Sequence, residues 1–187
     1  MKKNLLRGTM IIALGLSAYL GLYVDDYENV SSWIDDTEQR FRKLSKDEGA
    51  VDIEVVFHYT MTSEKITAKE LCDITNDRFG LGCSYAISIH DNGKVLQLND
   101  FAEHTPSVGG RNSKVISIAF VGDFRTKDIP PIMIERAKQI KKAFDAYDRD
   151  NDDFKIKGYY VHRDFRSTIC PTDNVVNALK KACIIAR

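Results

Sequence analysis

The chain has 187 residues, of which 43% are hydrophobic and 29% charged, and its 27 lysine and arginine residues are balanced by 27 aspartate and glutamate residues. This composition is typical of one globular domain, and it excludes a disordered chain, a collagen and a small disulfide-rich scaffold. The lack of a basic excess also argues against a nucleic-acid-binding protein, because neutralising phosphates requires surplus positive charge.

The N-terminal segment has the charge pattern of an export signal. Three basic residues precede an uncharged, largely apolar run at residues 8–24, and Asp25 is the first acidic residue. A cationic flank before an apolar run addresses a chain to the secretion machinery, and the positive-inside rule places the basic end in the cytoplasm. Residues 1–24 are therefore expected to be a signal anchor or a signal peptide, and the lack of an Ala-x-Ala sequence after the run favours the uncleaved anchor.

This signal predicts where the rest of the chain acts. We expect an exported protein that is either held in the inner membrane through residues 8–24 or released to the periplasm or the cell exterior. Residues 25–50 follow as a charged linker, in which helical spacing connects Trp33, Ile34, Thr37, Phe41 and Leu44. This spacing predicts an amphipathic helix that serves as a stalk or packs on the domain.

Residues 51–187 alternate between strand and helix patterns. Apolar runs rich in β-branched residues predict strands at 51–58, 115–122 and 158–162, and Asn92-Gly93 between two alternating runs predicts a hairpin. Strands mixed with helices, including one hairpin, indicate an α/β fold. We expect a single domain with a central mixed β-sheet flanked by helices, preceded by the N-terminal apolar anchor helix.

Three helices are expected to cover this sheet. Thr67 and Glu70 form a capping box that opens the first helix, whose Leu71 and Ile74 should face inward before it stops at Gly80. The second follows a pair of prolines and places these residues on its apolar face: Met133, Ala137, Ile140, Phe144 and Tyr147. The third closes the chain, with an apolar face of Val175, Val176, Leu179, Ala182 and Cys183.

The sequence contains four cysteines, which need not share one role. Cys72 and Cys83 lie close in sequence on either side of a helix end, so in an exported protein they either form a disulfide between helix and hairpin or remain thiols. Cys183, on the apolar face of the last helix, is expected to be a buried free thiol.

Three side chains are candidate metal ligands. His58 closes the first strand and His162 the last, so neighbouring strands would bring both imidazoles to one edge of the sheet, where sites in α/β folds form. Cys170 follows His162 after a loop long enough to fold back and place a thiolate beside the imidazole. Two histidines and one cysteine form a three-ligand Zn²⁺ set, and three protein ligands are typical of catalytic zinc, which keeps one position for water.

Four collinear motifs resemble those of the zinc-dependent N-acetylmuramoyl-L-alanine amidases, the family that includes phage lysozyme-type amidases and peptidoglycan recognition proteins. They are VVFHYT at 55–60, CSYAISIHDNGKVLQL at 83–98, His104 followed by NSKVISIAFVGDF at 112–124, and HRDFRSTICP at 162–171. The resemblance covers about residues 52–185. It implies that residues 51–187 form an amidase domain. The implied zinc ligands are His58, His162 and Cys170. The implied catalytic residues are Tyr85 and Thr168, and the implied substrate-binding residues are His104 and Asn112.

The family resemblance also implies the reaction and the partner. The substrate would be bacterial peptidoglycan, and the bond cut would be the amide between N-acetylmuramic acid and L-alanine, in cell-wall lysis or remodelling or as a phage endolysin. Tyr85 would donate a hydrogen bond to the oxyanion. We expect the protein to act as a monomer.

Two positions depart from many family members, and they leave alternatives open. Thr168 stands where many phage members carry a catalytic lysine, although active recognition proteins also carry threonine there. Ala119 stands where other bacterial members have a glutamate, so no general base is assigned. The alternatives are a non-catalytic peptidoglycan-binding recognition protein and a membrane-tethered structural protein with a cryptic zinc site. Non-catalytic members typically lose the cysteine ligand, so Cys170 favours the enzyme.

Overall fold

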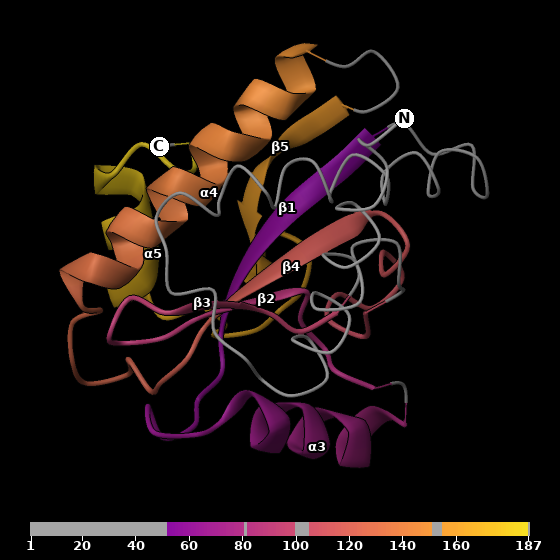
Figure 1. Cartoon of the computed structure of the whole chain (residues 1–187), viewed down its shortest axis with the longest axis vertical. Coiled ribbons are helices and arrows are strands. Elements are labelled where there is room, and N and C mark those ends of the chain that lie inside the picture. Colours follow the sequence, from indigo (N-terminus) through magenta and orange to yellow (C-terminus); the bar gives the residue numbers. More distant parts are fainter. Residues whose placement is uncertain (1–51, 81, 100–104, 151–154, 187) are drawn as a thin grey trace, which may run out of the picture.

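The computed structural model describes residues 52–80, 82–99, 105–150 and 155–186 (Figure 1). The expected anchor at 1–24, the charged linker at 25–50 and His104 lie outside these residues. Within the described part of the chain, no helix is both long and apolar enough to cross a bilayer.

A five-stranded sheet forms the centre of the domain, in the order β3-β2-β4-β1-β5. The strands are β1 (Asp52–Tyr59), β2 (Ile87–Ile89), β3 (Val95–Gln97), β4 (Val115–Phe120) and β5 (Lys155–Val161). β1 runs parallel to both β4 and β5, and β2 runs parallel to β4. Only the β2–β3 hairpin is antiparallel among the described pairs, so the predicted mixed sheet of a single α/β domain is confirmed.

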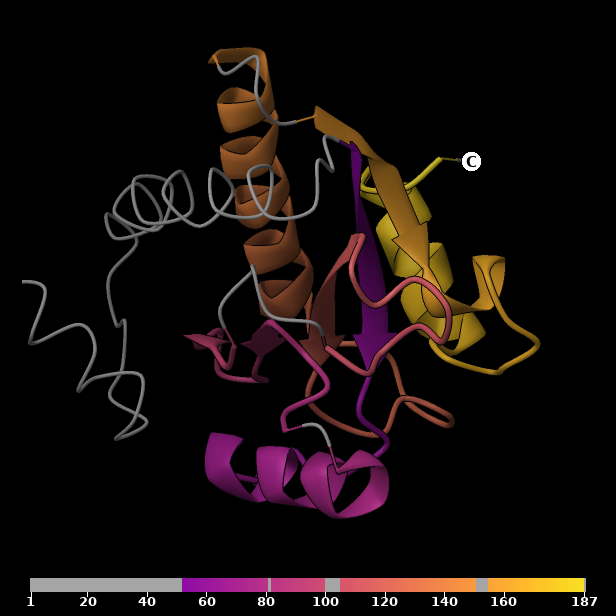
Figure 2. The same ribbon diagram turned by 90° about the vertical axis from the view of Figure 1, so that its right-hand side faces the viewer.

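One face of the sheet carries the apolar core. Alternate residues of β1, Ile53, Val55 and Phe57, are at most 2% exposed, because successive side chains of a strand point to opposite faces. Two helices pack on this face, α4 (Pro131–Asp150) and α5 (Asp173–Lys181) (Figures 1 and 2). The predicted apolar positions of α4 are confirmed where their side chains are described, at Met133, Ala137, Ile140 and Phe144.

The opposite face of the sheet combines a small apolar cluster of Val56, Val108 and Val115 with buried polar side chains. Glu54 and His58 of β1, Ser117 of β4 and Ser88 of β2 are each at most 5% exposed. Burying polar groups is unfavourable unless they find partners, so each of these polar side chains is a candidate for a specific contact or role.

α3 (Ala68–Phe79) lies beyond the C-terminal end of β1 (Figures 1 and 2). The predicted capping box is present, since the Thr67 hydroxyl accepts from the Glu70 N–H and the Glu70 carboxylate accepts from the Thr67 N–H. Gly80 ends the helix in the left-handed conformation, with φ of 68°. The prediction for Ile74 is wrong, because Leu71 and Thr75 form the inward row and turn Ile74 outward, where it is 50% exposed.

The end of α5 also differs from the prediction. The helix ends at Lys181, and Cys183 adopts a left-handed conformation with φ of 55° that reverses the chain. The reversal buries Ile184 and Ile185 in the core, while Cys183 is an exposed free thiol. The expectation of a buried Cys183 is therefore wrong, since the helical pattern does not extend to that residue. Cys72 and Cys83 form a disulfide, which is the first of the two alternatives expected for them.

Candidate metal centre

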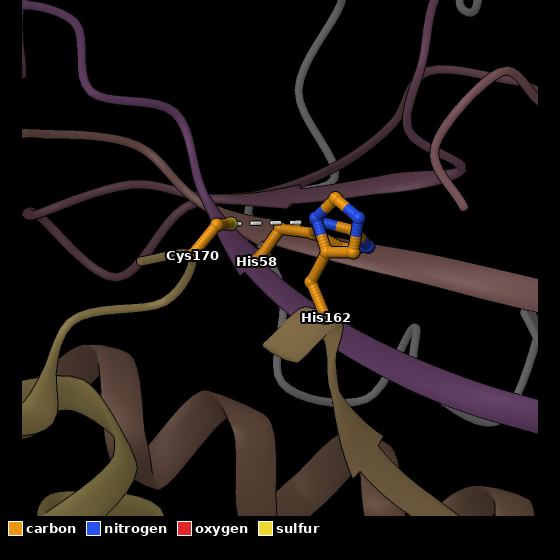
Figure 3. A group of neighbouring side chains, drawn as sticks. All are labelled: His58, His162 and Cys170. Atoms are coloured by element: carbon orange, nitrogen blue, oxygen red, sulfur yellow. Dashed lines mark hydrogen bonds between the residues drawn. The ribbon is translucent and has the colours of Figure 1, made fainter. Parts of the chain in front are cut away.

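The register of two parallel strands brings two histidines together. Phe57 of β1 is paired with Val161 of β5, so the next residues along both strands, His58 and His162, meet at the same edge of the sheet. β5 ends at Val161, and His162 is the first residue of a short 3-10 helix, η1 (His162–Asp164). The two imidazole centroids are 4.7 Å apart. Figure 3 shows the two rings beside each other.

Cys170 returns to this pair through the loop after η1. Its Sγ lies 3.7 Å from Nδ1 of His58, a contact marked in Figure 3. The same sulfur lies 3.8 Å from the carbonyl oxygen of Tyr59. The candidate ligand atoms of His58, His162 and Cys170 all lie within 4.8 Å of one another. Arg163 ties the loop to η1, because its guanidinium donates to the carbonyl oxygens of Ile169 and Pro171.

Burial sets the protonation of the three side chains. Desolvation, followed by the charge of His162, lowers the pKa of His58 well below its usual value, and desolvation also lowers the pKa of His162. Both imidazoles are therefore neutral at neutral pH and keep a lone pair for a metal. Burial raises the pKa of the Cys170 thiol to about 11, so this group ionises at neutral pH only with a cation beside it.

These residues fit a zinc ion. Ligands bound tetrahedrally at about 2.0 Å for nitrogen and about 2.3 Å for sulfur lie about 3.5 Å apart, close to the 3.7 Å between Cys170 Sγ and His58 Nδ1. His58 Nε2 is buried and has no hydrogen-bond partner among the described residues. Neither nitrogen of His58 is thus committed to a strong hydrogen bond, and mixed nitrogen and sulfur donors are typical of zinc sites.

Tyr85, for which a catalytic role is predicted, lies beside these candidate ligands. It precedes β2, and its ring centroid is 5.4 Å from that of His58. Burial, followed by the negative charge of a Cys170 thiolate, raises the pKa of Tyr85 well above its usual value. The phenol therefore keeps its proton at neutral pH and is a hydrogen-bond donor.

The other predicted site residues lie in different settings. The Thr168 hydroxyl accepts a hydrogen bond of 3.2 Å from the Cys170 N–H, which places it on the loop of this candidate metal ligand. The Asn112 side chain accepts from the Val108 N–H at 3.1 Å and so shapes its own loop. Ala119 is paired with His58 across β4 and β1, so the strand position next to this histidine carries no carboxylate. The roles of Thr168 and Asn112 stay predictions.

Sequence reasoning missed an ion pair on the face of the sheet opposite the apolar core. Both Glu54 oxygens accept hydrogen bonds from Arg111, at 2.6 and 2.8 Å, and the Arg111 guanidinium lies 4.6 Å from the ring centroid of Phe165. Arg111 thus links Glu54 of β1 to Phe165, the residue that follows η1. A glutamate inside an otherwise apolar strand was the available signal, since such a charge needs a buried partner.

Known proteins share this domain. The family model for N-acetylmuramoyl-L-alanine amidase matches residues 52–173, a range that contains His58, Tyr85, His162 and Cys170. No curated protein matches the sequence at a significant level.

Solved structures of similar fold come from bacterial, insect and phage sources. The endolysin N-acetylmuramoyl-L-alanine amidase LysCS from Clostridium intestinale URNW has a TM-score of 0.60 at 20% identity, over 70% of this chain and 83% of that chain. Bumblebee PGRP-SA has a TM-score of 0.60 at 19% identity, over 72% and 83%. The Ph2119 endolysin from the Thermus scotoductus MAT2119 bacteriophage has a TM-score of 0.56 at 19% identity, over 72% and 87%. These identities establish a shared fold, and the family match establishes more: this chain belongs to the N-acetylmuramoyl-L-alanine amidase family.

Proposed function

We propose that the protein is a zinc amidase that cleaves the bond between the lactyl group of N-acetylmuramic acid and L-alanine in peptidoglycan. The observation that carries the proposal is the convergence of His58, His162 and Cys170 beside the protonated Tyr85, within a domain of the amidase family. Hydrolysis breaks the amide C–N bond, adds a hydroxyl group to the lactyl carbonyl carbon and leaves a protonated amine on alanine.

The three candidate ligands and Tyr85 contribute to different parts of the hydrolysis. A zinc ion held by His58, His162 and Cys170 supplies Lewis acidity for the amide carbonyl and an activated water molecule. The Tyr85 phenol donates a hydrogen bond to the carbonyl oxygen as this atom gains negative charge, an interaction that strengthens toward the transition state. The Thr168 hydroxyl accepts from the Cys170 N–H and keeps its own proton for a second contact with substrate. We place His104 and Asn112 in the substrate groove.

A second candidate function is peptidoglycan binding without cleavage, as in a recognition protein. The observation that favours it is Ala119 beside His58, where other family members carry a glutamate. Cys170 and Tyr85 weigh against it, because a receptor needs neither a third metal ligand nor a donor for the oxyanion.

The Cys72–Cys83 disulfide also supports a location outside the cytoplasm. Disulfides persist in oxidising compartments and are rare in the cytosol. We propose that the protein is an exported monomer that reaches the cell wall while residues 8–24 anchor it in the membrane.

The amidase is tested by incubating the full-length protein with purified peptidoglycan and zinc, then labelling newly exposed alanine amino groups. We expect release by the wild type and none by His58→Ala. His90→Ala is the matched control, because His90 is also a buried histidine, 7% exposed, and lies outside the group of ligands. Binding without release would favour the receptor, and release by His58→Ala would overturn the proposed metal centre.

A further inference from the structure

We propose that the Cys72–Cys83 disulfide positions the catalytic Tyr85, so that oxidation of this cysteine pair activates the amidase. The inference rests on the proposed function, in which Tyr85 acts on the substrate. Cys72 and Cys83 are positioning residues in this scheme, since they act through Tyr85.

The backbone of Tyr85 lies outside the regular sheet. β2 begins at Ile87, and the anchoring of the chain to neighbouring strands starts only at Ala86, whose N–H donates to the carbonyl oxygen of Ser117 at 3.0 Å. The segment 82–85 therefore leads from the end of α3 to the sheet without strand pairing of its own. Contacts other than strand pairing must therefore fix the direction in which the Tyr85 side chain points away from this segment.

Side chains from outside the segment supply that restraint. The Ser84 N–H donates to the Thr75 hydroxyl at 3.1 Å, and the Gly82 N–H donates to the Asn76 side chain at 2.9 Å. From the other side, the Asn99 amide donates to the carbonyl oxygens of Cys83 and Tyr85, at 2.5 and 3.2 Å. The disulfide from Cys72 is the one covalent tie among these restraints.

The helix that holds the segment is itself lightly anchored. Leu71 and Thr75 are the buried residues of α3, and Ile74 and Phe79 are 50% and 46% exposed. A helix with so little buried apolar surface gains little stability from packing on the domain. The disulfide therefore joins two weakly held segments, α3 and residues 82–85, and each limits the motion of the other.

This arrangement makes the position of Tyr85 sensitive to the redox state. On oxidation, the two thiols lose two protons and two electrons to a disulfide oxidant, which is reduced to two thiols while the Cys72–Cys83 bond forms. On reduction the covalent tie is lost, and among the described residues the hydrogen bonds of Thr75, Asn76 and Asn99 remain to hold residues 82–85. A displacement of about 1 Å in a catalytic group costs as much as about 10²-fold in rate, so small movements of Tyr85 matter.

The first test is a double-mutant cycle on kcat and KM. We expect the paired change Cys72→Ser with Cys83→Ser to lower kcat about tenfold while KM and the bound zinc stay unchanged, an intermediate loss for a displaced donor. In the Tyr85→Phe background the same change should cause no further loss, because there is no donor left to position. Cys183→Ser, which removes the exposed free thiol, is the matched control and should leave kcat unchanged. Equal losses in both backgrounds would overturn the proposal.

The second test uses the unmodified protein, so its result does not depend on the folding of the serine variants. Reduction by a phosphine should lower kcat of the wild type about tenfold, and oxidised glutathione should restore it. Zinc content is measured throughout, because Cys170 is also a thiol. Thr75→Val removes the hydroxyl that holds Ser84 and should lower kcat in the same way, while Thr75→Ser should retain it.

These outcomes separate the two proposals. No hydrolysis by the oxidised wild type would refute the amidase itself. Equal hydrolysis by the oxidised and reduced wild type would leave the amidase standing and refute only the role of the disulfide.

Discussion

The two histidines and the other two central residues of the site are held in different ways. His58 and His162 belong to the ends of adjacent parallel strands, where the β1–β5 register sets their spacing. Cys170 and Tyr85 come from segments without strand pairing, and each needs a tie of its own, from Arg163 and from the Cys72–Cys83 disulfide. The sheet thus supplies one half of the site, and segments tied down from outside the sheet supply the other half.

The largest effect should come from removing Cys170, the candidate metal ligand on the loop. Cys170→Ser is expected to lower amidase activity by about 10³-fold or more, because a catalytic metal contributes several kcal/mol to stabilising the transition state. Bound zinc, measured by mass spectrometry of the dialysed protein, should fall in parallel. Cys183→Ser should keep both zinc and activity, and full zinc occupancy in Cys170→Ser would contradict the proposed set of ligands.

Tyr85→Phe tests the other loop-held residue without disturbing the metal. Losing one donor to a developing oxyanion costs about 10²-fold in kcat, and the zinc content should not change. Steady-state kinetics on soluble peptidoglycan fragments, combined with metal analysis, check both. A variant that loses its zinc would show that Tyr85 supports the ligands instead of the substrate.

Arg111→Ala loosens the support under the strand-held half. It leaves Glu54 as a buried charge without its partner, and because the Arg111 side chain is 44% exposed we expect a loss of about 2–3 kcal/mol in the free energy of unfolding, below the full cost of an entirely buried pair. Urea denaturation measures the loss. Lys69→Ala is the control, since it breaks an exposed ion pair with Asp73 and should leave stability unchanged.

The smallest expected effect concerns the start of α3. Thr67→Ala removes the hydroxyl that accepts from the Glu70 N–H, which costs about 1 kcal/mol for a helix N-cap. Hydrogen exchange should show faster opening of α3, while amides of β1 and β4 keep their protection. Thr67→Ser retains the acceptor and should behave as the wild type, and a loss spread evenly over the sheet would contradict the separate behaviour of α3.

The features that the sequence predicts well are those set by local rules. Apolar runs rich in β-branched residues predict the strands, Asn92-Gly93 between alternating runs predicts the hairpin, and Thr67 with Glu70 predicts the start of α3. The proximity of His58 and His162 is predicted because each closes a strand, and the ends of neighbouring strands would bring both imidazoles to one edge of the sheet. The position of Cys170 is predicted because the loop after His162 is long enough to bring the thiolate back beside the imidazole.

The features that the sequence misses depend on tertiary contacts. Helical spacing allows Ile74 to face inward, but the packing of Leu71 and Thr75 decides the rotation of α3. Cys183 fits the apolar face of a longer helix, and only the reversal of the chain at that residue exposes it. The Glu54–Arg111 pair joins residues far apart in sequence, so no local pattern predicts which arginine is the partner.

The β1–β5 register also orders events during folding. Cys170 lies 112 residues after His58, and His162 reaches His58 only when β5 has paired with β1. Contacts this distant in sequence form late, because the entropy of closing such a long loop opposes them. The three candidate ligands therefore come together only in a chain whose C-terminal strand is already in place, and we expect tight binding of a metal by all three to follow the pairing of β5 with β1.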